Sequence, residues 1–243
     1  MAVDTPATIA VIGAGPIGLE AALYARFLGY VVRVYERGRV AENFLTHISR
    51  AAWVSYTSPL GIAAIAAQRP DWQPPAVDTV LSAQELIEMY FLPLAQSDLL
   101  VDSMQVGTEV LAVERDPSLE SGTADDDEVP GFLLRVRDAA GERVDSVDVV
   151  IDASGADSSP LAGSSLYAKL NLPGSAAPPV DRHNNVDPTR LITAEPDLYI
   201  LGAKSAAVPA EFGVRDGLTQ IRDLFTIISD RATLNLYDTV IAR

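Results

Sequence analysis

The chain of 243 residues contains no cysteine, and this absence removes several kinds of chemistry at once. Without thiols there are no disulfides, thiolate zinc sites, iron–sulfur clusters or redox-active C-x-x-C pairs. Histidine is scarce as well, since only His47 and His183 occur. Because no group of metal-binding residue types stands at a recognisable spacing, we predict no metal site.

Basic residues are few: 18 Lys and Arg stand against 33 Asp and Glu, for a formal net charge of −15. An acidic surface repels nucleic acid, so we expect no DNA or RNA partner. No apolar run is long enough to span a membrane, and the first six residues lack the basic n-region of a signal peptide. We therefore expect a cytoplasmic protein with no membrane partner, and the length favours a single domain.

A glycine pattern near the start of the chain joins an apolar run to a helical pattern. Residues 9–12 are Ile-Ala-Val-Ile and predict a buried strand, and residues 16–28 predict a helix. Between and just inside them, Gly13, Gly15 and Gly18 match G-x-G-x-x-G. The first glycine permits a tight turn, the second lets the backbone approach a pyrophosphate, and the third lets the helix pack closely. The helix N-terminus would supply N–H groups to phosphates.

An acidic residue follows where such a motif places a ribose ligand. Residues 31–35 predict a second strand, and Glu36 comes directly after it. A carboxylate there can accept hydrogen bonds from both ribose hydroxyls, and it disfavours a 2′-phosphate and hence NADP. The alternative is a plain glycine-rich turn with Glu36 at the surface. Three neighbours complete this part of the predicted site: Pro16, Ile17 and Arg37.

Residues 40–60 show no clear period. They follow the second strand, so they belong to the loops beyond the carboxyl ends of strands, where doubly wound sheets bind ligands. Trp53 and Tyr56 either face a cofactor ring or pack within the loop, and His47 is either catalytic or structural.

A helical segment is predicted farther along. Residues 62–67 predict a short helix, and Ser82-Ala-Gln-Glu85 matches a capping box. The capping box opens a helix that extends to about Ser97, and Pro93 predicts a kink in it.

The chain then changes to alternating apolar and polar residues. Residues 107–115, 132–138 and 142–147 predict three strands of an antiparallel β-meander. The acidic run 125–128 is most simply a solvated loop, because it lacks the spacing of a calcium-binding EF-hand. Residues 149–151 predict a short buried strand that ends in Ala153-Ser154-Gly155.

Residues 157–193 are rich in Pro, Gly, Ser and Asn and predict a long connection. The next strand, predicted over residues 198–202, ends at Gly202, and Lys204 follows at its carboxyl end. Residues 214–229 predict a strong helix with one apolar face.

This order of parts resembles the two-dinucleotide-binding-domain flavoproteins, the glutathione-reductase-like and flavin-monooxygenase-like group. That group has the glycine fingerprint, the ribose acid, a β-meander, an "A-T-G"-like strand end, and a late strand ending in Gly-Asp before a C-terminal helix. Residues 40–105 match poorly. The resemblance implies an α/β fold: a single Rossmann-like FAD-binding domain over residues 1–243. It would have a parallel central sheet, a helical insertion at about 61–105 and a β-meander at about 106–148.

The resemblance also implies roles for particular residues. Glu36 would bind the adenosine ribose, Val110 would meet adenine through its backbone, and Gly202 would approach the diphosphate or ribityl chain. Ala153, Ser154 and Gly155 take the place of the strand end. These matches point to FAD rather than NAD, because a simple NAD domain has no meander followed by a returning strand and helix.

Three features of this sequence depart from the motifs of the group. Ala203-Lys204 stands where the group has Asp, so Lys204 either balances diphosphate charge or lies on the surface. A second glycine fingerprint and the F-x-G-x-x-x-H signature of flavin-containing monooxygenases are absent. We therefore expect a reduced version of the fold, without a separate nicotinamide domain.

We therefore expect an FAD-dependent oxidoreductase, monooxygenase-like, that acts on a small molecule or with a redox partner protein. His47, Tyr56 and Lys204 are the candidates for an acid or base. The alternatives are a non-catalytic FAD-binding sensor or electron-transfer partner, and a simple NAD-binding Rossmann enzyme.

Overall fold

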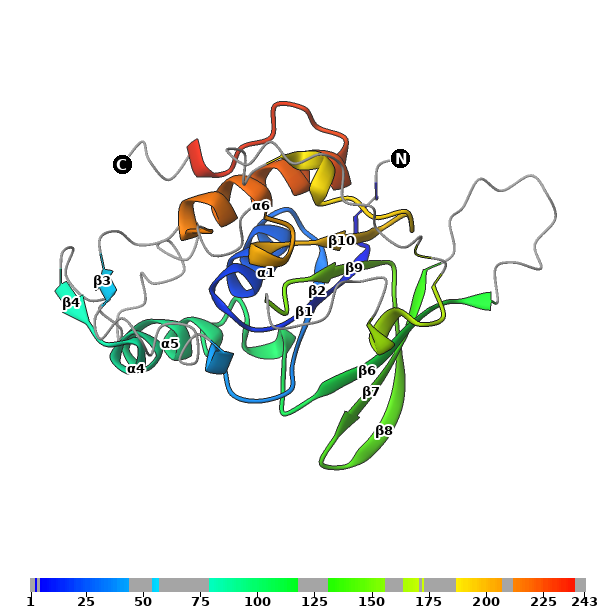
Figure 1. Cartoon of the computed structure of the whole chain (residues 1–243), viewed down its shortest axis with the longest axis horizontal. Coiled ribbons are helices and arrows are strands. Elements are labelled where there is room, and N and C mark those ends of the chain that lie inside the picture. Colours follow the sequence, from blue (N-terminus) through cyan, green and yellow to red (C-terminus); the bar gives the residue numbers. More distant parts are fainter. Residues whose placement is uncertain are drawn as a thin grey trace.

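A parallel sheet of five short strands forms the centre of the fold in the computed structural model (Figure 1). The structure describes residues 3, 5–43, 54–56, 79–117, 131–155, 164–170, 172, 187–206 and 212–238. The strands of the sheet, in spatial order, are β10 (Leu198–Ile200), β9 (Val149–Asp152), β1 (Thr8–Ile12), β2 (Val31–Glu36) and β5 (Met104–Val106). Each pairs in parallel with its neighbour. Both faces of a parallel sheet are covered, which explains why these strands are so apolar.

The strand order reverses direction between β1 and β9. From β1 the chain proceeds outward to β2 and β5, and it later returns to the other side of β1 to form β9 and β10. In open α/β sheets, ligands bind outside the carboxyl ends of the strands at such a switch point. The end of β1 and the end of β9 therefore mark where a ligand is expected.

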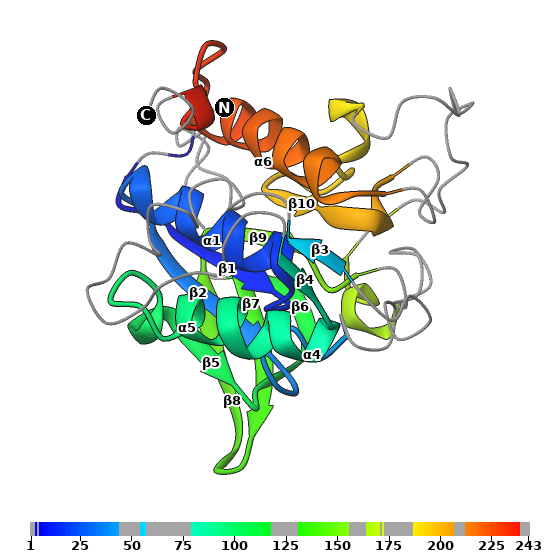
Figure 2. The ribbon, with the colours of Figure 1, turned by 90° about the vertical axis from the view of Figure 1, so that its left-hand side faces the viewer.

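Helices cover one face of the sheet and the meander covers the other (Figures 1 and 2). On the helical face, α1 (Pro16–Phe27) packs with α6 (Val214–Ser229), and Ile9 and Val11 of β1 point into this core. On the other face, Ala10 and Ile12 join the core of the meander. The alternation of β1 side chains between the two cores is the period of two expected of a strand.

The meander consists of β6 (Glu109–Arg115), β7 (Phe132–Asp138) and β8 (Gly141–Val147). Its strands pair antiparallel in sequence order, as the alternating pattern predicted. The α/β fold, with its parallel sheet and three-stranded meander, is thus confirmed.

Three described segments differ from or extend the predictions. Residues 104–106 form strand β5 at the edge of the sheet and so do not belong to a helical insertion ending near 105. The short strands β3 (Val54–Tyr56) and β4 (Thr79–Leu81) form a separate antiparallel pair. Several predictions concern residues outside the described ones: the helix at 62–67, the acidic run 125–128, and His47, Trp53 and His183.

The helix opened by Ser82 begins with the predicted capping box. The Ser82 N–H donates to Glu85 Oε2 at 2.8 Å, and the Glu85 N–H donates to Ser82 Oγ at 3.2 Å. The helix then passes through three parts: α4 (Ala83–Leu86), a π-helical turn (Ile87–Phe91) and α5 (Leu92–Ala95). No helix in the described part of the chain is long and apolar enough to cross a membrane.

The π-turn is a consequence of Pro93. Proline has no N–H, and its ring clashes with the carbonyl four residues earlier. The chain widens by one residue just before it, so that the Leu92 N–H donates to the Ile87 carbonyl five residues back. The predicted disturbance of the helix at Pro93 therefore takes the form of a π-turn upstream of the proline.

A tyrosine–aspartate bond joins the parallel sheet to the meander. The Tyr35 hydroxyl of β2 donates to Asp145 Oδ2 of β8 at 2.9 Å. Burial, and then the hydrogen bond to Asp145, raises the pKa of Tyr35 to about 12. The neutral phenol is therefore the form that the folded protein stabilises.

Tyr35→Phe tests this link through its pH dependence. A raised pKa gives stability that is fully present below the ordinary value near 10 and is lost as the pH rises toward 12. At pH 8 we expect the wild type to exceed the variant by about 1 kcal/mol in unfolding free energy. Above pH 10 this advantage should shrink by up to about 1.4 kcal/mol per pH unit. Urea unfolding followed by circular dichroism at pH 8, 10 and 11 measures both. The other tyrosines are common to both proteins, and an advantage that stays constant would contradict the assignment.

Candidate cofactor-binding site

The glycine fingerprint forms a tight turn between β1 and α1 at the switch point. Gly13 has a φ of 104°, and a Cβ on it would lie 2.8 Å from the Ala153 carbonyl oxygen at the end of β9. A Cβ on Gly18 would lie 2.0 Å from the Gly13 carbonyl oxygen. These two glycines therefore let β1, α1 and the end of β9 meet with only backbone between them.

Gly15 differs from the other two glycines. Its φ is −75°, which any L-residue can adopt, and a Cβ built on it would meet no atom of the described residues within 4 Å. With respect to that part of the chain the space in front of Gly15 is open, and it lies at the first turn of α1. A ligand that needs close backbone approach fits this position.

The N-terminus of α1 is prepared for an anion. Pro16 occupies the first turn, which contains no acidic residue, and no side chain of the described residues caps this helix end. The first N–H groups of a helix have no partner within it, and they stand at the positive end of the helix dipole. An anionic group in front of Gly15 would meet both.

Glu36 reaches from the end of β2 to the fingerprint turn. Its Oε2 accepts from the Ala14 N–H at 2.9 Å, and its Oε1 accepts from the Gly38 N–H at 2.9 Å. The side chain is half-buried, so the alternative of a surface glutamate unrelated to the turn is wrong. The carboxylate and the open space at Gly15 belong to one site.

A buried polar cluster lies at the end of β9, on the other side of the switch point. Asp152 is fully buried and accepts four hydrogen bonds. Its Oδ1 accepts from the Ser154 N–H at 3.0 Å and the Ser154 hydroxyl at 2.5 Å. Its Oδ2 accepts from the Tyr167 hydroxyl at 2.8 Å and from Lys204 Nζ at 2.6 Å. Burial, and then the charge of Asp152, raises the pKa of Tyr167 well above its ordinary value, so Tyr167 serves here as a neutral donor.

Lys204 is not the surface residue that one alternative proposed. Its side chain is only 8% exposed, because it extends from the turn after β10 back to the end of β9. Besides Asp152, its Nζ contacts Ser154 Oγ at 3.1 Å. The cluster brings together two residues that sequence reasoning placed in the site, Ser154 and Lys204, and two that it missed, Asp152 and Tyr167.

The remaining predicted residues lie around this edge with different roles. The Gly202 N–H donates to the buried Gln220 side chain of α6 at 2.8 Å, so Gly202 ties β10 to the helix. Val110 is half-buried at a bulge in β6, and Arg37 is exposed just after Glu36. Tyr56 is in β3.

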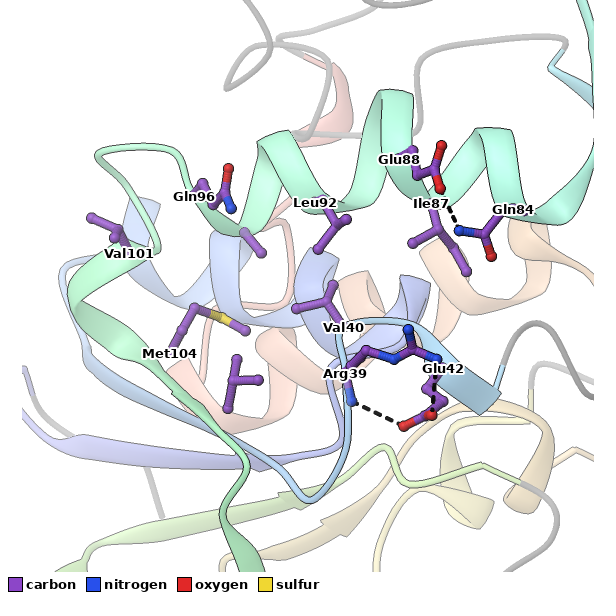
Figure 3. A pocket seen from close by; sticks show the side chains of 12 residues that line it. Arg39, Val40, Glu42, Gln84, Ile87, Glu88, Leu92, Gln96, Val101 and Met104 are labelled. Atoms are coloured by element: carbon purple, nitrogen blue, oxygen red, sulfur yellow. Dashed lines mark hydrogen bonds and ion pairs between the residues drawn. The ribbon is translucent and has the colours of Figure 1, made fainter. Parts of the chain in front are cut away.

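A separate cavity of about 420 Å³ opens between the α4–α5 helical segment, the loop after β2 and strand β5 (Figure 3). Apolar side chains line its interior, and two polar pairs stand at its rim: Arg39 with Glu42, and Gln84 with Glu88. Val106, at one edge, is paired with Glu36 in the sheet. The cavity thus adjoins the Glu36 end of the candidate site, but no residue of the glycine fingerprint lines it.

Comparisons with known proteins agree with this architecture. No protein-family model matches the chain, and no curated protein matches its sequence. Among solved structures, THI4 from Thermovibrio ammonificans matches 91% of this chain and 90% of its own, at 15% identity and a TM-score of 0.57. The bacillithiol disulfide reductase Bdr (YpdA) from Bacillus cereus matches 93% of this chain and 99% of its own, at 12% identity and a TM-score of 0.56. This chain shares their fold. Each match covers nine-tenths or more of both chains.

Two matched substitutions separate the fold from the site. Gly18→Ala should destabilise the protein by about 1–3 kcal/mol, because the new methyl group would overlap a backbone oxygen. Gly15→Ala should change stability by less than about 1 kcal/mol, because its methyl group would enter open space. Urea unfolding of the ligand-free proteins measures both. Equal losses for the two variants would show that the turn is packed differently.

Proposed function

We propose that this chain is an FAD-binding oxidoreductase in which one FAD lies along the carboxyl edge of the parallel sheet. The observation that carries the proposal is the arrangement around Gly15: an open approach to the backbone, an uncapped helix N-terminus, and the Glu36 carboxylate bonded to the same turn. The helix end suits a diphosphate, and the carboxylate suits a ribose.

The adenosine end of the cofactor is supported most directly. Glu36 now accepts from two backbone N–H groups, and the ribose hydroxyls of a dinucleotide would offer it further donors. A carboxylate at this position disfavours the additional phosphate of NADP. FAD is preferred to NAD because the meander and the returning strand β10 accompany the fingerprint, as in the flavoproteins that the sequence resembles.

Bound FAD would supply hydride or electron transfer at its isoalloxazine ring. The chain itself would bind and orient the cofactor. In this acidic protein, Lys204 provides a positive charge at the carboxyl edge of the sheet. The N-terminus of α6 is less suited than the N-terminus of α1 to stabilise negative charge on a flavin. The carboxylate of Asp216 already accepts a hydrogen bond there, from the Gly213 N–H at 2.9 Å. A monooxygenase-like reaction on a small molecule is the finer form of this proposal. A sensor or electron-transfer protein that binds FAD without catalysis is the second form.

The absorption spectrum of the purified protein, before and after reconstitution with FAD, tests the proposal. We expect flavin bands that remain with the protein through gel filtration. Gly15→Val should weaken FAD binding by more than about tenfold, because its side chain would occupy the space of the pyrophosphate. Ala140→Val, at the exposed β7–β8 turn away from the switch point, is the control. A colourless protein that binds NAD would favour the simple Rossmann enzyme instead.

Glu36→Ala tests the orientation of the cofactor. Loss of charge-assisted hydrogen bonds to the ribose should weaken FAD binding by about 1–3 kcal/mol. Riboflavin and FMN lack the adenosine, so their affinities should stay the same. Glu36→Gln, which keeps an acceptor for the Ala14 N–H, should lose less than Glu36→Ala. Calorimetric titration of the apoprotein gives all three affinities, and equal losses for FAD and FMN would place Glu36 elsewhere.

A further inference from the structure

The two lysines of the chain lie in contrasting surroundings. Lys169 is 65% exposed and pairs with Glu114 at 2.6 Å on the meander. Lys204 is buried and pairs with Asp152, also at 2.6 Å, at the switch point. A buried ion pair is weak evidence for stability, because removing two charges from water costs several kcal/mol per ion. The position of the buried pair therefore calls for a functional explanation.

The hydrogen bonds of Asp152 and Lys204 leave the Lys204 ammonium able to bind a ligand. Asp152 keeps three other donors, the Tyr167 hydroxyl and two groups of Ser154. Its hydrogen bonds are therefore met even when the ammonium leans toward another anion. Among the described residues, Lys204 Nζ donates to Asp152 and Ser154. An ammonium has three N–H donors, so these two bonds within the described part of the chain leave one donor for a further acceptor.

The cluster stands directly beside the fingerprint turn. Ser154, the second acceptor of Lys204, lies so close that a Cβ on Gly13 would come within 3.0 Å of the Ser154 Cα. The N-terminus of α1, whose first N–H groups have no partner within the helix, begins three residues after Gly13. An anion at the switch point would therefore have the helix end on one side and the ammonium on the other.

Resting on the proposed function, we propose that Lys204 binds the diphosphate of the cofactor and that Asp152 holds its ammonium in place. A diphosphate carries two negative charges, and the chain carries a formal net charge of −15. A helix end alone offers only partial positive charge. Lys204 supplies a full positive charge at the place where the dianion would otherwise approach an acidic protein. The proposed role depends on the positive charge of Lys204, so a neutral side chain of similar length should not fulfil it.

Three variants isolate this charge. Lys204→Met removes it and keeps the length of the side chain. Asp152→Asn/Lys204→Met removes both charges, so that no carboxylate is left unpaired. Lys169→Met removes the other ion-paired lysine and serves as the matched control. Thermal unfolding of each apoprotein establishes that it is folded, and the double variant keeps the test usable if Lys204→Met alone does not fold.

The probes are FAD, ADP-ribose and adenosine, titrated calorimetrically into the apoproteins at low and high salt. ADP-ribose carries the diphosphate without a flavin, and adenosine carries neither. Both Lys204 variants should bind FAD and ADP-ribose roughly tenfold to a hundredfold more weakly than the wild type, with a smaller salt dependence. Adenosine affinity should be unchanged in every variant, and Lys169→Met should match the wild type with all three probes.

Several results would overturn this assignment. Unchanged ADP-ribose affinity in both Lys204 variants would remove Lys204 from the diphosphate. Wild-type affinity in the double variant alone would mean that the unpaired Asp152 carboxylate caused the loss. A changed flavin midpoint potential with unchanged ADP-ribose affinity would place the ammonium at the isoalloxazine ring. Failure of the wild type to bind FAD would instead refute the proposed function.

Discussion

The approach of α1 to β1 with no side chain between them is the constraint on which the rest of the site depends. A Cβ at Gly18 would lie 2.0 Å from the Gly13 carbonyl oxygen, so the first turn of the helix rests on the backbone of the strand end. This contact places the N-terminus of α1 at the point where the strand order reverses. It also brings the end of β9 against Gly13, through the Ala153 carbonyl. The open space before Gly15 follows from this packing.

From that contact outward, the site is built from both sides of β1. On the β2 side, Glu36 bonds to the Ala14 N–H and so fixes the loop that follows β2 against the turn. On the β9 side, Asp152 gathers Ser154, Tyr167 and Lys204 from three separate segments. One side thus offers a carboxylate, suited to hydroxyl groups, and the other offers an ammonium, suited to a phosphate. A dinucleotide carries hydroxyl groups on its ribose and negative charge on its diphosphate, so it has one kind of group for each side.

Much of the fold and part of the candidate site could be predicted from the sequence, because these features depend on local patterns. The fingerprint, Glu36 and the strands of the meander are short-range signals, and each was found where expected. Strand β5 was missed because it has only three residues, half-buried or exposed, so its apolar pattern is too brief. Its identity as a strand comes from pairing with β2, which is a tertiary effect.

The polar cluster could not be predicted for a different reason. The burial of Lys204 depends on a carboxylate 52 residues earlier in the chain, and no local pattern links the two. A signal was nevertheless present, because Asp152 ends the apolar run Val149-Val-Ile and a charged residue there needs a partner. Pro93 was read correctly as a disturbance of the helix, but the π-turn that precedes it could not be read from the proline alone.

Two tyrosine–aspartate bonds link the parallel sheet to the segments that pack on its meander face. The Tyr35 hydroxyl reaches Asp145 on the meander, and the Tyr167 hydroxyl reaches Asp152 at the end of β9. In both pairs the tyrosine is buried and donates to a carboxylate, which raises its pKa. Both bonds therefore keep their proton at neutral pH, and neither titrates where an enzyme normally works. The Tyr167 hydroxyl therefore remains a donor to Asp152, the carboxylate that pairs with the ammonium of Lys204.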